Sequence, residues 1–245
     1  FYPRPFLTNQ SGKAIDIHPS FRVDDLKPQL WDAITGEIKE LSDYTASDGR
    51  TSIPLKMDVD RSWFVVFSND SNESVAKGSI ENTPEYKVAQ TIDSSWNIDF
   101  ESKNIAPESI RTSELMDWSK SEDNLLKYYS GTANYTTTFT YQKSDAKDVV
   151  LDLGKVGVLA TVRLNGKNIG TSWVAPYRLN IRDAVQEGSN KLEIKVVNVW
   201  RNRLTGDKTL PVEQRTTSVL VDGITPEEAM SSSGLMGPVT IQIVK

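Results

Sequence analysis

The side chains best suited to chemistry in this sequence are aromatic and planar polar groups that gather in two short segments. The first segment runs from Trp173 to Arg178 and includes Tyr177. Sugar rings present apolar C–H faces, so sugar sites pair a flat aromatic ring with nearby guanidinium, amide or carboxylate groups. The segment directly follows a predicted hairpin, and binding residues gather on loops that a rigid scaffold positions. The segment predicts carbohydrate binding; the alternative is that Trp173 and Tyr177 close the end of the core.

The second segment follows an apolar run that ends at Asn198. Its candidate residues are Asn198, Trp200, Arg201, Asn202, Arg203 and Asp207. These residues suit a sugar or an interface with a neighbouring domain, and we favour the interface because Arg201 and Arg203 can pair with acids there. Asp207 could equally anchor its loop by accepting backbone N–H groups.

The residue counts argue against two common kinds of catalytic site. The chain has one histidine, His18, and no cysteine. A Ser-His-Asp triad needs an imidazole beside a nucleophilic serine, and a zinc site needs at least three protein ligands. His18 lies on a predicted strand without such a serine nearby, so we expect a structural or surface role for it.

Glycoside hydrolysis needs only two carboxyl groups, one of them with a raised pKa. The 33 acidic residues exclude nothing by number. Asp99 with Glu101 and Glu227 with Glu228 are candidate pairs, but acidic residues close in sequence are usually solvated. We therefore expect no catalysis by this chain alone.

The overall composition is that of a globular protein without a nucleic-acid or membrane partner. The chain has 245 residues and a net charge of −5, whereas nucleic acid and anionic membranes attract basic surfaces. It contains no apolar stretch near 18 residues.

Apolar alternation predicts an antiparallel β-sandwich. Apolar runs at 149–153 and 158–164 lead into Asn165-Gly166, and a strand with clean alternation follows Gly188. An Asn-Gly pair between such runs is the strongest short hairpin signal, because a type I′ turn needs positive φ at both central residues. Roughly five to six short strands are also expected before residue 70.

The chain is predicted to form two domains. Residues 1–70 form a small antiparallel β-sandwich, which need not be complete, and residues 71–85 are polar and turn-rich enough for a linker. Residues 86–245 form the larger domain. Within it, the stretch 208–233 lacks alternation and is expected to be a functional or mobile loop.

The order of motifs in the larger domain resembles a known module. A strand, the Asn165-Gly166 hairpin, Trp173, a Pro-Tyr-Arg segment and a strand ending in Asn198 follow one another. This order resembles the sugar-binding jelly roll of family 2 glycoside hydrolases.

Further motifs narrow the resemblance. The segments 128–135, 198–207 and 233–239 resemble the C-terminal region of family 106 α-L-rhamnosidases, and Pro28 to Ile38 fits the region before the jelly roll.

The resemblance implies an all-β chain of two β-sandwich domains, the second a galactose-binding-like jelly roll. It implies the non-catalytic C-terminal part of a periplasmic or secreted bacterial glycoside hydrolase. Its expected partners are an upstream catalytic barrel and carbohydrate, with rhamnose-containing glycans as the substrate of the parent. The chain starts at Phe1 rather than Met, which fits a fragment or a processed product.

No cofactor is expected apart from structural calcium, which such jelly rolls often hold with loop carboxylates. The scattered residues Asp123, Asp148, Asp152 and Asp183 do not define a metal site.

Other hypotheses stay open. The chain could be an independent, lectin-like carbohydrate-binding module, or a purely structural one. The parent could also be a family 2 β-galactosidase or β-glucuronidase.

Overall fold

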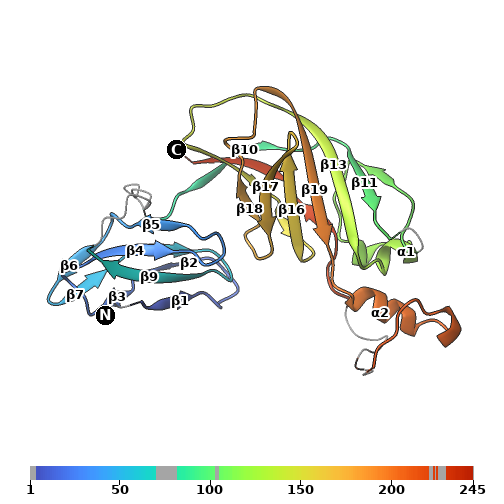
Figure 1. Cartoon of the computed structure of the whole chain (residues 1–245), viewed down its shortest axis with the longest axis horizontal. Coiled ribbons are helices and arrows are strands. Elements are labelled where there is room, and N and C mark those ends of the chain that lie inside the picture. Colours follow the sequence, from blue (N-terminus) through green and yellow to red (C-terminus); the bar gives the residue numbers. More distant parts are fainter. Residues whose placement is uncertain are drawn as a thin grey trace. The chain divides into compact units, whose positions relative to one another are not determined.

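The computed structural model describes residues 4–69, 82–102, 105–220, 223, 225 and 230–244. It divides the chain into two compact units, Phe1–Glu85 and Tyr86–Lys245. The paired strands of both units run antiparallel, and the predicted all-β class is confirmed (Figure 1). Residues 71–81 of the predicted linker lie outside the described residues.

The first unit is made of short strands. They are β1 (Phe6–Thr8), β2 (Ile15–Ile17), β3 (Ser20–Phe21), β4 (Lys27–Trp31), β5 (Ile38–Glu40), β6 (Thr45–Ser47), β7 (Arg50–Ser52), β8 (Leu55–Met57) and β9 (Ser62–Ser68). The orders in its sheets are β1-β9-β4-β5, β2-β8 and β3-β7-β6. The apolar run in β9 is a central strand, as its lack of alternation predicts, although Phe64 on it remains exposed.

The first unit has a core of its own. Its buried residues are Leu30, Leu41, Ile53, Leu55, Met57, Trp63, Val65 and Phe67. Asn82 belongs to this unit because its side-chain amide donates to the carbonyl oxygens of Asp43 (2.6 Å) and Pro54 (3.0 Å).

The second unit is a sandwich of two main sheets. The first six elements are β10 (Tyr86–Thr91), β11 (Trp96–Phe100), β12 (Ile110–Thr112), η1 (Trp118–Lys120), α1 (Asn124–Lys127) and β13 (Thr132–Tyr141). The next five are β14 (Asp148–Asp152), β15 (Lys155–Val156), β16 (Leu159–Leu164), β17 (Lys167–Ser172) and β18 (Arg178–Asn180). The last five are β19 (Gly188–Val197), α2 (Arg201–Lys208), η2 (Val212–Gln214), β20 (Leu235–Gly237) and β21 (Thr240–Val244).

The two main sheets enclose one core. The six-stranded sheet has the order β12-β11-β13-β19-β16-β17, and the four-stranded sheet has the order β10-β21-β14-β18. Alternate residues of the strands point inward, as in β11, where Trp96, Ile98 and Phe100 are buried. Side chains from both sheets, such as Leu192 and Ile241, join the same core cluster.

The Asn-Gly hairpin is confirmed. Strands β16 and β17 pair with Leu164 opposite Lys167, and Asn165 and Gly166 have φ angles of 53° and 79°. These positive φ angles are those that a type I′ turn needs. The side chain of Asn165 also donates to the Ala184 carbonyl oxygen in the connection before β19 and bonds to Asn190 and Lys191 within β19, so it links the hairpin turn to that connection and strand.

One end of the core is filled by aromatic rings. Trp118 stacks on Tyr135 with ring centroids 5.8 Å apart, and it also contacts Phe100 and Tyr129. Trp118 and Trp96 are buried in the core of this unit, and Trp63 is buried in the core of the first unit.

The helix α2 is not predicted by the sequence pattern. The residues that it buries are polar or charged, apart from one glycine: Asn202, Arg203, Thr205, Gly206 and Asp207. Helix prediction relies on an apolar face that repeats every 3.6 residues, and α2 has none.

Candidate functional site

Two exposed tryptophans follow strands that finish at the same end of the six-stranded sheet. The register pairs Leu159 at the start of β16 with Val197 at the end of β19, and Ala160 with Ser172 at the end of β17. The chain segments after β17 and after β19 therefore begin at one sheet end, two strands apart. Figure 1 shows α2, in orange, beyond that end of β19.

We call the exposed apolar side chains at this end the strand-end surface: Trp173, Val199 and Trp200. Trp173 is 57% exposed and Trp200 is 58% exposed. Large aromatic side chains of soluble domains are mostly buried, so two exposed ones at one sheet end are informative. They can offer flat apolar faces to the C–H face of a sugar ring.

The rest of the first predicted segment is engaged elsewhere. The Tyr177 hydroxyl donates to the carbonyl oxygen of Val158 (3.1 Å), and burial raises the pKa of Tyr177. Tyr177 packs against the core, as the structural alternative for it states.

Arg178 lies on the four-stranded sheet. Its Nε atom is 2.8 Å from Asp152 Oδ2, and its guanidinium lies over the Tyr86 ring, 4.7 Å from the ring centroid. The Gln242 amide also donates to Asp152 Oδ2 (2.9 Å). Asp152 and Gln242 were not predicted as partners of Arg178, because they are brought to it by strand pairing over long sequence distances.

Asn198 fastens the end of β19. Its side-chain oxygen accepts from the backbone N–H of Gly234 (2.7 Å), and its own N–H donates to the Gly131 carbonyl oxygen (3.0 Å). A Cβ atom at Gly157 would lie 2.4 Å from Asn198 Oδ1. Asn198 thus joins four chain segments at the base of the strand-end surface.

Asn202 holds a distant loop against α2. Its side-chain nitrogen donates to the Ser231 carbonyl oxygen (2.6 Å), and its side-chain oxygen accepts from the Ser231 N–H (2.9 Å). This reciprocal pair connects residues 29 positions apart.

Arg203 and Asp207 form a buried ion pair one helical turn apart. Arg203 is 6% exposed and Asp207 is 2% exposed, and Arg203 Nε donates to Asp207 Oδ1 (2.9 Å). Arg203 therefore finds its counter-charge in its own helix rather than on a neighbouring domain.

Asp207 also anchors the chain after α2. Its Oδ2 atom accepts from the backbone N–H groups of Thr216 (3.0 Å) and Thr217 (2.8 Å), and from the Thr217 hydroxyl (2.6 Å). Burial by itself would raise the pKa of Asp207. Hydrogen bonds from Thr217 and Arg203, together with the positive charge of Arg203, outweigh burial and lower that pKa. The two threonines carried no sequence signal, because nine and ten residues separate them from Asp207.

The nine predicted residues thus divide into two groups. Tyr177, Arg178, Asn198, Asn202, Arg203 and Asp207 are engaged in contacts that hold the end of the sandwich. Trp173 and Trp200 are exposed, and Arg201, the first residue of α2, is half-buried.

The candidate catalytic carboxylates do not form a site in the part of the chain that is described. Glu101 lies 2.8 Å from Lys195, and the Lys195 hydrogen bond lowers the pKa of Glu101. Glu227 and Glu228 lie outside the described residues. His18 is exposed, one residue after β2.

Within the described ranges, no cluster of three or more acidic, histidine or cysteine side chains could hold a metal ion. Three of the scattered aspartates have other partners: Asp123 caps α1, Asp148 accepts from Asn180, and Asp152 accepts from Arg178. No helix in those ranges is long and apolar enough to cross a membrane.

Comparison with protein families gives a match over residues 93–227, which is more than half of the chain. The matching model is described as the glycosyl hydrolase 2 galactose-binding domain-like family. The chain belongs to this family. The matched range begins before β11 and extends beyond α2, so it covers most of the sandwich and the strand-end surface.

Two longer proteins are similar to this family member over most of its length. A protein of Formosa agariphila named "Putative beta-glucuronidase" is 35% identical over an alignment of 231 residues, and the match covers 78% of this chain and 20% of that protein. The solved structure of a rhamnosidase from Novosphingobium sp. PP1Y is 37% identical and has a TM-score of 0.84 over 98% of this chain. The match covers 22% of the rhamnosidase chain. The chain therefore spans about a fifth of the length of these two proteins.

Proposed function

We propose that this chain is a non-catalytic β-sandwich region of a glycoside hydrolase that acts on rhamnosides. The observation that carries the proposal is the match to the rhamnosidase structure, at 37% identity over 98% of the chain. This match includes both units, whereas the family model covers part of the second unit only. A periplasmic or secreted location is part of the proposal, and fractionation of the source cells tests it.

The ionisation of the described carboxyl groups supports a non-catalytic role. A glycosidase acid needs a raised pKa. The carboxyl groups with a displaced pKa in the described ranges are Glu101, Asp117 and Asp207, and in all three the pKa is lowered. These groups stay ionised near neutral pH, so they are unsuited to protonate a leaving group.

The strand-end surface is the proposed site of carbohydrate contact. Trp173 and Trp200 provide exposed aromatic faces, and Arg201 follows Trp200 directly. The buried contacts of Asn198, Asn202 and Asp207 hold the backbone beneath them. Such a rigid platform lowers the entropy lost when a ligand binds.

A parent enzyme that acts on β-glucuronides is the second candidate. The 35% identity to the Formosa agariphila protein favours it. Substrate choice by sugar charge distinguishes the two, because a glucuronide carries a carboxylate and a rhamnoside does not.

The test is a titration of the 245-residue chain with methyl α-L-rhamnoside, rhamnosyl oligosaccharides, methyl β-D-glucuronide and galactose, followed by tryptophan fluorescence and calorimetry. We expect saturable binding of rhamnosides that is weakened in Trp173→Ala and Trp200→Ala. Phe6→Ala is the matched control, because Phe6 is similarly exposed (55%) but lies on the first unit.

Preference for the glucuronide would favour the second candidate. If Trp173→Ala, Trp200→Ala and Phe6→Ala bind the sugar equally well, the strand-end surface is not the binding site. A folded chain that ignores every sugar would support a purely structural role, and release of p-nitrophenol from an aryl α-L-rhamnoside would overturn the non-catalytic assignment.

A further inference from the structure

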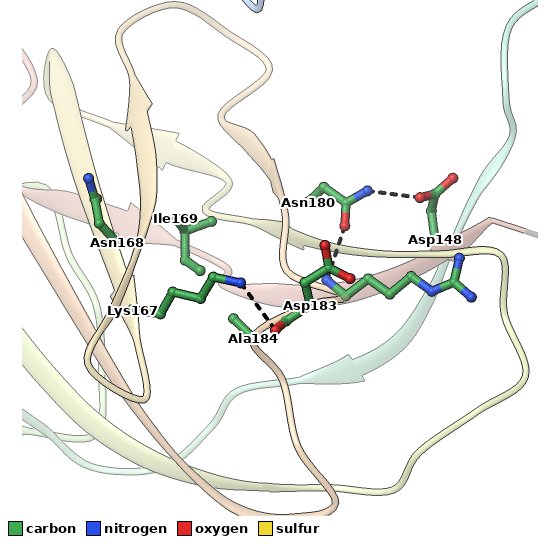
Figure 2. Close-up of a pocket in the computed structure, with 8 residues that line it drawn as sticks. Asp148, Lys167, Asn168, Ile169, Asn180, Asp183 and Ala184 are labelled. Carbon is green, nitrogen blue, oxygen red and sulfur yellow. Dashed lines mark hydrogen bonds between the residues drawn. The ribbon is translucent and has the colours of Figure 1, made fainter. Parts of the chain in front are cut away.

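A shallow groove opens on one side of the second unit, where the edge strands of its two sheets meet. Strand β17 is the edge of the six-stranded sheet, and β18 is the edge of the four-stranded sheet. The groove has a volume of about 430 Å³. It is lined by Asp148, Lys167, Asn168, Ile169, Asn180, Arg182, Asp183 and Ala184 (Figure 2).

The groove is separate from the strand-end surface. Lys167 is the first residue of β17, whereas Trp173 follows the last residue of that strand. A ligand in the groove would therefore meet the opposite end of β17.

The backbone around the groove is held rigidly by two asparagines. Asn165 Nδ2 donates to the Ala184 carbonyl oxygen (2.9 Å) and to Asn190 Oδ1 (2.8 Å). Asn190 is fully buried and donates to the carbonyl oxygen of Gln186 (2.8 Å). The turn that carries Asp183 and Ala184 is thus positioned before any ligand arrives.

Hydrogen bonds also order the polar walls. Figure 2 shows Lys167 reaching toward Asp183, whose carbonyl oxygen it contacts at 3.3 Å, and Asn180 donating to Asp148 (2.8 Å). The Asp183 carboxylate has no bonding partner in the described residues and lies in the groove lining. It is an available acceptor for hydroxyl groups.

The floor and the charge balance indicate the kind of ligand. Ile169 and Ala184 pack against the core and give the groove an apolar part. Two carboxylates, from Asp148 and Asp183, balance the cations of Lys167 and Arg182. A neutral ligand with hydroxyl groups at its edge and an apolar face fits such a lining better than an anion does.

We propose that this groove is a second saccharide-binding site, which takes one neutral pyranose unit of a glycan. The apolar face of the sugar lies on Ile169 and Ala184, while its hydroxyl groups donate to Asp183 and accept from Lys167. The proposal rests on the proposed function for its glycan, but the site is independent of the strand-end surface.

The test is NMR titration of the ¹⁵N-labelled 245-residue chain with methyl α-L-rhamnoside and, separately, with methyl β-D-glucuronide. We expect the rhamnoside to shift the amide signals of residues 167–169 and 182–184. Asp183→Ala should weaken that binding about tenfold, which corresponds to loss of a hydrogen bond to a charged group. Lys167→Met is the second variant, and Asp99→Ala, an exposed aspartate on β11, is the matched control.

The positions of the shifted amide signals show which surface binds the sugar, so failure of the groove proposal can be distinguished from failure of the proposed function. Shifts at the groove that survive Trp173→Ala support a second site. Shifts confined to residues near Trp173 and Trp200 overturn the groove and leave the proposed function standing. Stronger binding of the glucuronide at the groove, or no effect of either groove variant, also overturns it.

Discussion

Asp207 accepts hydrogen bonds from an arginine on its own helix and from two threonines beyond that helix. A buried carboxylate is tolerated only when its charge and lone pairs are matched in this way. The ion pair therefore belongs to the scaffold beneath the strand-end surface. The same logic applies to Asn165, whose amide satisfies three backbone or side-chain groups around the hairpin.

Replacing Asp207 should destabilise the chain strongly. Asp207→Asn leaves the buried Arg203 without its counter-charge, and breaking a buried pair in this way costs about 3 kcal/mol. Urea unfolding followed by near-ultraviolet circular dichroism measures the loss. The control Asp93→Asn, at an exposed position, should change the free energy of unfolding by less than about 0.5 kcal/mol. A loss no larger than that of the control would contradict the role of Asp207.

The contribution of Asp207 should also depend on pH. Its folded-state pKa lies below the ordinary aspartate value of 3.8. At pH values near these two pKa values, the folded chain therefore binds fewer protons than the unfolded chain. The stabilisation is complete above the unfolded-state pKa and is lost as pH falls through the folded-state pKa. The difference in unfolding free energy between wild type and Asp207→Asn should be constant from about pH 5 to 7 and shrink below about pH 4. A difference that grows on acidification would rule this out.

Asn165→Asp should weaken the hairpin. The new carboxylate would face the Ala184 carbonyl oxygen and Asn190 Oδ1, which now accept from the Asn165 amide. The loss of both donors should cost about 1–3 kcal/mol. Thermal unfolding at neutral pH checks it, with Asn168→Asp, an exposed position on β17, as the control. Equal melting temperatures of the two variants would refute the prediction.

At the scale of elements, Gly234 allows the chain before β20 to approach the aromatic end of the core. Gly234 precedes β20 and has a φ of +83°, and a Cβ atom there would lie 2.7 Å from the Trp118 indole. Gly166 in the hairpin has a similar φ of +79° but has no atom within 4 Å of its Cβ position. Substitutions at Gly166 and Gly234 therefore separate the cost of backbone strain at positive φ from the cost of steric overlap.

Gly166→Ala should cost about 1–2 kcal/mol, because an L-residue is strained at that φ. Gly234→Ala should cost more, since it adds overlap with a buried ring that cannot move freely. Chemical unfolding of both variants gives the comparison. Near-ultraviolet circular dichroism should report a changed Trp118 environment in Gly234→Ala only, and equal costs would contradict the steric argument.

At the scale of the whole molecule, each unit has its own hydrophobic core. The core of the second unit is formed by residues between Ile92 and Ile241, and that of the first unit by residues between Leu30 and Phe67. A unit with its own core can fold independently.

A shortened chain of residues 86–245 should therefore fold alone. We expect a cooperative thermal transition and the near-ultraviolet signal of its buried tryptophans. It should also retain the Trp173-dependent sugar binding of the full chain. A shortened chain that lacks a cooperative transition would show that the first unit is needed for folding.

The sequence by itself determined the all-β class, the Asn-Gly hairpin and the segments that carry exposed aromatic residues. These features follow from local rules: alternation along a strand, positive φ in a turn, and aromatic residues placed next to turns. The helix α2 escaped prediction because it buries Asn202, Arg203 and Asp207 instead of an apolar face.

Only the tertiary structure decided which candidate side chains are free. Trp173, Tyr177 and Arg178 lie within six residues of one another, yet Arg178 meets Asp152 and Tyr86 on the other sheet while Trp173 stays exposed. The partners of Asp207 and the lining of the groove likewise come from segments far apart in the chain. Strand pairing brings such groups together, and pairing over long sequence distances leaves no mark at the individual residues.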